Sequence, residues 1–225
     1  MLALLLALAR EPPDVSALTS RPGFGDAALA VPAGAVLVNP GLTVAGPPGS
    51  TAPDVLIRIG LVEGLEARGA VVFDASGPAV TLAPSFAVAA QLASEGDLAP
   101  AVLGVLTLAL PTGADPAGLA LEARISGAKA FGDLGVAVNL ALTQSATGTG
   151  ALGTLGASYA LGPLTPFVEA FVDDTVARGA PPDVWIDAGT AVGITRTVAV
   201  DVSAGATVVG DRALFVSVGA SVLWP

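Results

Sequence analysis

Hydrophobic residues recur at every second position through most of this chain. In the segment 197–208, Val198, Val200 and Val202 alternate with polar or small residues such as Asp201 and Ser203. Successive side chains of a β-strand point to opposite faces, so this period of two predicts a strand with one apolar and one polar face. No helical periodicity of useful length competes with it.

The same alternation recurs in a series of short segments separated by Gly, Pro and polar residues, which is typical of all-β proteins. The predicted strands span 33–44, 53–61, 65–74, 84–92, 101–110, 119–128, 133–143, 151–161, 164–173, 184–192, 197–208 and 212–224. A chain of 225 residues is long enough for one large β-domain or barrel.

Composition indicates which face meets the solvent. Of the residues, 53% are hydrophobic and only 12% are charged, and the mean hydropathy is +0.77. An ordinary soluble domain has about 25% charged residues, and a soluble β-sandwich with these strands would expose far too many Ala, Gly and Ser. No apolar run reaches the roughly 18 residues of a transmembrane helix. We therefore expect the apolar face to contact lipid and the polar face to line a lumen.

The charged residues within the predicted strands support this orientation. In the middle of the strands they fall on the less apolar set of positions, and Arg212 lies on the apolar set only at a strand end. A Lys or Arg on the lipid face at the bilayer midplane costs about 2–4 kcal/mol. The predicted lumen-lining residues are Arg58, Glu66, Arg68, Glu122, Arg124, Asn139, Glu169, Asp187, Asp201 and Ser203.

The connections provide a second indication, because outer-membrane barrels alternate long extracellular loops with short periplasmic turns and have an even number of strands. Predicted long connections are 45–52, 75–83, 111–118, 144–150 and 174–183, whereas 62–64, 129–132, 162–163 and 193–196 are short. Only 209–211 is a short connection on the long-loop side. The fold prediction is a closed antiparallel up-and-down transmembrane β-barrel of about twelve strands (ten to fourteen) over residues 33–225.

Two segments precede the predicted barrel. Residues 1–9, "MLALLLALA", are apolar, too short to span a bilayer and rich in small residues at their end. They have the character of a signal-peptide remnant, although a basic region is missing. Residues 10–32 are expected to form an N-terminal periplasmic segment.

The composition excludes several kinds of chemistry. The chain has no His and no Cys, which removes Ser–His catalysis, thiol nucleophiles and the usual zinc sites. The net charge of −10 argues against a nucleic-acid partner. We expect no enzymatic activity, no catalytic residue, no metal and no cofactor, and the expected partners are the lipid bilayer and small solutes.

Several short motifs resemble those of one family. "LTSRPGFGD" at 18–26 is followed by "VPAGAVLVNPGLTV" at 31–44, and "LIRIGLVEGLEAR" spans 56–68. "GDL" at 96–98 and "LALPTG" at 108–113 also fit. With these motifs the chain resembles a family of bacterial outer-membrane proteins named for transport in the meta-pathway of phenol degradation.

The resemblance implies an outer-membrane β-barrel with a transport role, and it supplies no catalytic residues. Ser20 and Asn39 stand where the family usually has Asp and Glu, and the aromatic content of 4% is low for a barrel with aromatic girdles. The chain also ends in Pro225, whereas barrels of this kind usually finish on an aromatic residue.

The expected function is that of a passive outer-membrane channel or transporter for small solutes. Inward-facing aromatic residues favour aromatic compounds as solutes, and an excess of inward carboxylates favours a mild preference for cations. The alternative is a β-barrel with a packed, non-conducting interior and a structural or engineered role, because inward Arg and Glu side chains can pair and fill a narrow barrel.

Overall fold

The structure is a computed structural model that describes residues 14–20, 25–46, 50–74, 81–110, 118–174, 182–210 and 213–225. The expected signal-peptide remnant at 1–9 lies outside the described residues, as do Arg21 and Pro22 of the first family motif and residues 111–113 of the last.

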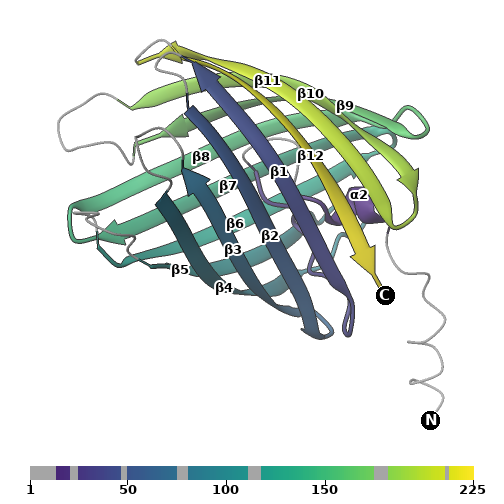
Figure 1. Cartoon of the computed structure of the whole chain (residues 1–225). Helices are drawn as coiled ribbons and strands as arrows, with labels where there is room; N and C mark the ends of the chain where they lie inside the picture. Colours follow the sequence, from purple (N-terminus) through teal and green to yellow (C-terminus); the bar gives the residue numbers. More distant parts are fainter. Residues whose placement is uncertain are drawn as a thin grey trace.

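The described residues form one short helix and a series of long strands (Figure 1). The helix is α2 (Val15–Leu18). The strands are β1 (Val36–Gly46), β2 (Ser50–Val62), β3 (Leu65–Asp74), β4 (Thr81–Ala93), β5 (Ala101–Ala109), β6 (Ala120–Phe131), β7 (Leu134–Ser145), β8 (Gly148–Tyr159), β9 (Leu164–Asp173), β10 (Asp183–Thr195), β11 (Val198–Val209) and β12 (Leu214–Trp224).

Each strand pairs with its neighbours in sequence, and the first strand pairs with the last. The order β1-β12-β11-β10-β9-β8-β7-β6-β5-β4-β3-β2 closes on itself (Figure 1). The closing ladder between β1 and β12 is antiparallel, with Leu42 opposite Val218 and Val44 opposite Val216. The prediction of a closed antiparallel up-and-down barrel of about twelve strands is confirmed.

Alternate side chains of each strand point outwards and inwards, as predicted. On β11, Val200 and Val202 are 40% and 44% exposed, whereas Asp201 between them is 8% exposed. The outward set on the other strands is also apolar, with exposed Leu, Val and Ile. The apolar face therefore lies on the outside of the barrel and the acidic face on the inside.

Among the described residues, no helix is long and apolar enough to cross a bilayer.

The connections differ from the predicted ones in two places. The predicted long connections 45–52 and 144–150 are short, because β1 and β2 extend to Gly46 and from Ser50, and β7 and β8 are joined by a turn at Ala146 and Thr147. The alternation of long and short connections is thus weaker than the sequence predicts. We call the end of the barrel with the turns 63–64, 132–133 and 196–197 the short-turn end, and the other the long-loop end.

Among the described strand residues, one charged side chain lies on the outward face, at a strand end. The sequence ends the sixth predicted strand at 128, but β6 continues to Phe131 and thereby places Lys129 on the outward set near the short-turn end. Its ammonium lies 3.2 Å from Glu95 Oε1 and also donates to the carbonyl of Gly96. The only charge on the outward face of the described strands thus lies at a strand end and is paired with an acid.

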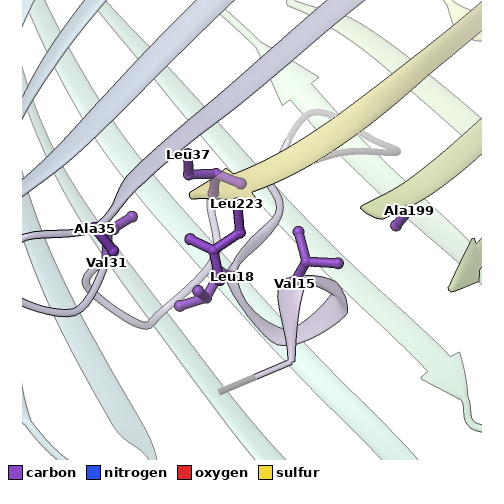
Figure 2. Packing of buried hydrophobic residues seen from close by; sticks show 7 residues of the cluster. All are labelled: Val15, Leu18, Val31, Ala35, Leu37, Ala199 and Leu223. Atoms are coloured by element: carbon purple, nitrogen blue, oxygen red, sulfur yellow. The ribbon is translucent and has the colours of Figure 1, made fainter. Parts of the chain in front are cut away.

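The N-terminal segment, which we define as the described residues 14–20 and 25–35, passes inside the ring of strands near the short-turn end (Figure 1). Its α2 residues Val15 and Leu18 are fully buried against Leu37 of β1 and Leu223 of β12, together with Val31, Ala35 and Ala199 (Figure 2). The alternation of apolar and polar residues predicts no strand before residue 33, and the described residues of this segment contain none. The alternation does not predict that the segment contacts the inner wall.

Candidate functional site

A cluster of charged side chains from β2 and β3 occupies the inner wall. Arg58 and Glu66 are fully buried, and Arg58 Nε lies 2.9 Å from Glu66 Oε1. Arg58 Nη2 lies 3.0 Å from Glu66 Oε2, so the pair is bidentate. Arg68 Nε also donates to Glu66 Oε1. Arg58 and Arg68 face each other across the β2–β3 ladder. Glu66 accepts from both side chains and so offsets the repulsion between the two cations.

The N-terminal segment is tied to this cluster. Arg58 donates from Nη1 to the carbonyl of Leu18 and from Nη2 to the carbonyl of Leu29. The amide of Val31 donates to Glu66 Oε2 over 2.6 Å. Gly60 lets this backbone approach β2, because a Cβ at Gly60 would lie 1.9 Å from the carbonyl oxygen of Pro32.

Asp26 links the N-terminal segment to two further strands. Its Oδ1 lies 2.9 Å from Arg68 Nη1 on β3, and its Oδ2 lies 3.8 Å from Arg124 Nη1 on β6. Arg124 also contacts Glu122 at 3.0 Å, so Glu122 and Arg124 form an ion pair on the same inward face of β6.

Two opposing effects act on the pKa of the Asp26 carboxyl group. Burial alone would raise its pKa, but the positive charges of Arg68, Arg124 and Arg58 and a hydrogen bond from Ser20 hold the pKa below its usual range. Asp26 is therefore a carboxylate at neutral pH.

The opposite wall binds the N-terminal segment through polar side chains of β7 and β9. The amide of Asp26 donates to Asn139 Oδ1 over 2.9 Å, and the amide of Gly25 donates to Glu169 Oε2 over 3.3 Å. Asn139 Nδ2 in turn donates to Thr154 Oγ1 over 3.0 Å. Contacts on two sides of the barrel thus hold the N-terminal segment across the lumen.

A cavity of about 320 Å³ remains between the N-terminal segment and the wall of β6 to β9. The wall contributes small side chains here, and the lining of the cavity includes Asp26, Ala137, Asn139, Gly156, Ser158 and Glu169.

The remaining inward residues form an acidic and aromatic wall on β9 to β12. Asp187 of β10 is 2% exposed and lies opposite Glu169 of β9 in the ladder. Asp201 and Ser203 of β11 are also buried. These four strands contain no Lys or Arg, so the wall is acidic whereas the wall of β2, β3 and β6 carries the arginines.

Aromatic rings lie among these acids. Phe171 of β9 stacks on Trp185 of β10 with ring centroids 5.6 Å apart and planes 5° from parallel. Phe215 of β12 tilts against Trp185 at 5.9 Å. Phe215 and Asp187 meet over Gly205 of β11, where a Cβ would lie 2.4 Å from Phe215 Cε1 and 2.6 Å from Asp187 Cβ.

The structure places the predicted lumen residues on the inward face but does not bring all of them together. Arg58, Glu66, Arg68, Glu122 and Arg124 join one ion-paired cluster through Asp26. Asn139 and Glu169 contact the N-terminal segment on the other side, and Asp187, Asp201 and Ser203 lie on the acidic wall. Whether this set lines a path for solutes stays a prediction.

Asp26 is the residue that the sequence prediction missed. It lies at the end of the motif "LTSRPGFGD", so the family resemblance contained a signal, but a local pattern does not reveal which distant strand a motif contacts.

No protein-family model matches the chain, and no curated protein matches its sequence. Solved structures do match its fold. The COG4313 outer membrane channel from Pseudomonas putida F1 is 10% identical, with a TM-score of 0.67 over 91% of this chain and 100% of that one.

Two porins also have folds similar to that of this chain. The KdgM porin, solved in complex with disordered oligogalacturonate, is 12% identical with a TM-score of 0.66, over 83% of this chain and 98% of that one. The NanC porin is 8% identical with a TM-score of 0.60, over 82% and 98%. At these identities the comparison establishes the fold: the chain has the fold of bacterial outer-membrane β-barrel channels.

Proposed function

We propose that this protein is a bacterial outer-membrane channel through which small solutes cross passively. The observation that carries the proposal is the orientation of the barrel wall, which is apolar outside and charged inside, around a lumen that keeps a cavity of about 320 Å³. A polar interior inside a lipid-facing apolar band is the arrangement of porins.

The lipid bilayer is the proposed partner of the outer face. Exposed Phe131, Tyr159 and Trp224 end the strands β6, β8 and β12, all at the short-turn end. Aromatic residues at this level fit the interface between hydrocarbon and head groups. The short-turn end is the periplasmic end in this proposal.

Cations are the preferred ions in this proposal. Arg58, Arg68 and Arg124 of the inner wall pair with Glu66, Asp26 and Glu122, whereas the strands β9 to β12 contribute acids and no Lys or Arg. The net field of the lumen is then negative, and rings of acidic side chains select for cations. Aromatic compounds are the proposed organic solutes, supported by the inward rings on β9, β10 and β12 and by the resemblance to the phenol meta-pathway family.

The function includes no enzymatic step. Without His or Cys, activation of a serine by a neighbouring base has to rest on a carboxylate, and the inward acids are better explained as parts of the lumen wall.

A second candidate is a barrel with a packed, non-conducting interior. The N-terminal segment favours it, since this segment crosses the lumen and is bound on both sides, by Glu66 and by Asn139. The cavity beside the segment is the observation that favours the channel.

Planar-bilayer recordings separate the two candidates. The full chain, folded in detergent and checked by its heat-modifiable migration on a gel, is reconstituted from lipid-free stock. We expect discrete conductance steps and a reversal potential of cation-selective sign in a salt gradient. Folded protein that inserts into bilayers but produces no conductance above the lipid alone would contradict the channel and support the packed interior.

A further inference from the structure

The barrel closes where its first strand pairs with its last, and we call the ladder between β1 and β12 the seam (Figure 1). The other neighbouring strands of the barrel follow each other in sequence, whereas β1 and β12 lie at opposite ends of it. Bringing together two strands so far apart in sequence costs more chain entropy than closing a hairpin. The seam is therefore the pairing that gains most from additional contacts.

The ladder of the seam is interrupted within β1. The described pairs cover residues 36–38 and 41–46 of β1 and leave out Asn39 and Pro40, although both of these residues pair with β2 on the other side. Pro40 has no amide hydrogen to donate across the seam. A proline inside a ladder weakens it for this reason, so the backbone holds the seam less firmly at this point.

The side chain of Asn39 lies at the same interruption. Asn39 is 1% exposed, and neither its Oδ1 nor its Nδ2 has a hydrogen-bond partner among the described residues. A buried amide group without a partner is costly, because its lost hydration is not replaced. The interrupted ladder and this amide both reduce the stability of the seam around residues 39–40.

The helix α2 packs against the inner side of the seam next to this interruption. Leu37 of β1 and Leu223 of β12 are direct partners in the ladder. Both belong to one buried cluster with Val15 and Leu18 of α2 (Figure 2). The apolar side chains of α2 therefore contact both strands of the seam at once, and separating the strands would expose this cluster.

A polar contact lies one step further along the seam. Thr19, which follows α2, has its Oγ1 2.6 Å from the Oγ of Ser221 on β12. The flanking pairs of the ladder place Ser221 level with Asn39. The N-terminal segment thus binds β12 at the level where β12 has lost its ladder contacts with β1.

Backbone hydrogen bonds connect the segment to strands on both sides of the seam. The amide of Val15 donates to the carbonyl of Arg196, in the turn between β10 and β11, over 3.0 Å. The amide of Gly34 donates to the carbonyl of Gly60 on β2 over 2.9 Å, and the amide of Gly60 donates to the carbonyl of Ala35 over 3.0 Å. The segment therefore contacts β2 on one side of the seam and β12 and the β10–β11 turn on the other.

We propose that the N-terminal segment is a latch that keeps the seam closed. Its helix α2 covers the inner side of the two strands, and its hydrogen bonds to both sides oppose their separation. This role goes beyond the proposed function and does not depend on it, because a conducting and a packed barrel both have to close. The segment is then required for the integrity of the barrel wall as well as occupying the lumen.

Amide hydrogen exchange of the full chain in bilayer nanodiscs, measured by mass spectrometry, tests the latch. Leu18→Ala removes most of an apolar side chain that contacts the seam. We expect exchange in β1 and β12 to become at least about tenfold faster, because the seam opens locally, while exchange in β6 and β7 stays unchanged within about twofold.

Leu103→Ala is the matched control. Leu103 is also fully buried, but it packs with Ala89 and Val105 on β4 and β5, away from the seam. The same truncation at this position should leave exchange in β1 and β12 unchanged within about twofold.

A covalent link across the seam provides a second test. Val44 and Val216 are direct partners in the ladder and are exposed on the outward face, and the chain has no cysteine. Val44→Cys and Val216→Cys together therefore place two thiols within reach of one disulfide. On the Leu18→Ala background, the oxidised chain should exchange in β1 and β12 within about twofold of the unaltered chain, and reduction should restore the fast exchange.

Exchange that rises equally in all strands of Leu18→Ala, or that does not rise in β1 and β12, would overturn the latch. Fast exchange that persists in the oxidised, cross-linked chain would overturn it as well. If Leu18→Ala does not fold, Thr19→Val is measured in the same way, since it removes the hydroxyl group that contacts Ser221. The latch then requires faster exchange in β1 and β12 than in β6 and β7 of that variant.

Discussion

Arg68 Nη1 lies 2.9 Å from Asp26 Oδ1, and this ion pair joins the N-terminal segment to the inner wall of the barrel. Both side chains are largely shielded from solvent, at 5% and 12% exposed. Since Arg124 contacts the other oxygen of the same carboxylate, one acidic residue of the N-terminal segment connects β3 and β6. Asp26 is therefore one of the contacts that hold the segment in the lumen.

Replacing Asp26 with Asn should loosen the N-terminal segment. Removing one partner of a buried ion pair leaves the other charge uncompensated, and we expect a loss of about 3–5 kcal/mol in the free energy of unfolding. Conductance in planar bilayers should increase, because the lumen is then less obstructed. Asp14→Asn is the matched control, since it removes an exposed charge from the same segment while Asn still caps α2. Equal conductance of the two variants would show that Asp26 does not restrain the segment.

The same carboxylate predicts how the protein responds to acid. Its pKa is below the ordinary value of 3.8, so its stabilising contribution is fully present above that value and is lost as the pH falls through the lower, folded pKa. The contribution of Asp26 to the thermal unfolding midpoint should therefore stay constant with pH near neutrality and be lost only in strong acid. The difference in midpoint between the unaltered chain and Asp26→Asn should shrink only in strong acid, and a difference that already shrinks near neutral pH would contradict the ion-pair assignment.

The contact between Phe215 and Gly205 predicts a sensitive site on the acidic wall. In Gly205→Ala the new Cβ would lie 2.4 Å from Phe215 Cε1, so the ring or Asp187 must move. Overpacking of this kind destabilises by about 1–3 kcal/mol. Gly69→Ala is the control, because nothing lies within 4 Å of a Cβ there. In urea unfolding in detergent, Gly205→Ala should have a lower midpoint than Gly69→Ala. Equal midpoints would mean that the Phe215 ring can move away from the new methyl group without cost.

The acidic wall predicts the sign of ion selectivity. Changing Glu169 to Gln and both Asp187 and Asp201 to Asn should move the reversal potential in a salt gradient towards zero. The same number of charges removed at the exposed residues Asp14, Asp97 and Asp133 should have little effect, because solvent screens them. An unchanged reversal potential in the wall variant would remove the basis for cation preference.

The sequence predicted those features of the fold that depend on local periodicity. Val200, Asp201 and Val202 alternate because strand geometry requires it, and the low charge of the chain indicated that the apolar face lies outward. The ends of the strands were less predictable. Polar residues such as Gln144 and Ser145 have the character of a loop in the sequence but continue β7.

The partners of the inward residues could not be predicted in the same way. Arg58 and Glu66 lie close in sequence and share a hairpin, so their pairing follows from the register. The contacts of Asp26 with Arg68 and of Asp26 with Asn139 join residues far apart in the chain. Local periodicity does not indicate which distant residues come into contact. The inward path of the N-terminal segment could therefore be recognised only in the closed barrel.

Spin labels at two adjacent residues can show whether the apolar face of the barrel contacts hydrocarbon and the acidic face lines the lumen. The chain has no cysteine, so Val202→Cys and Ser203→Cys each give one labelling site on β11. In bilayers we predict that the label at 202 collides readily with oxygen dissolved in the lipid and that the label at 203 is shielded from it. The reverse ranking, or equal collision rates at the two positions, would contradict the account.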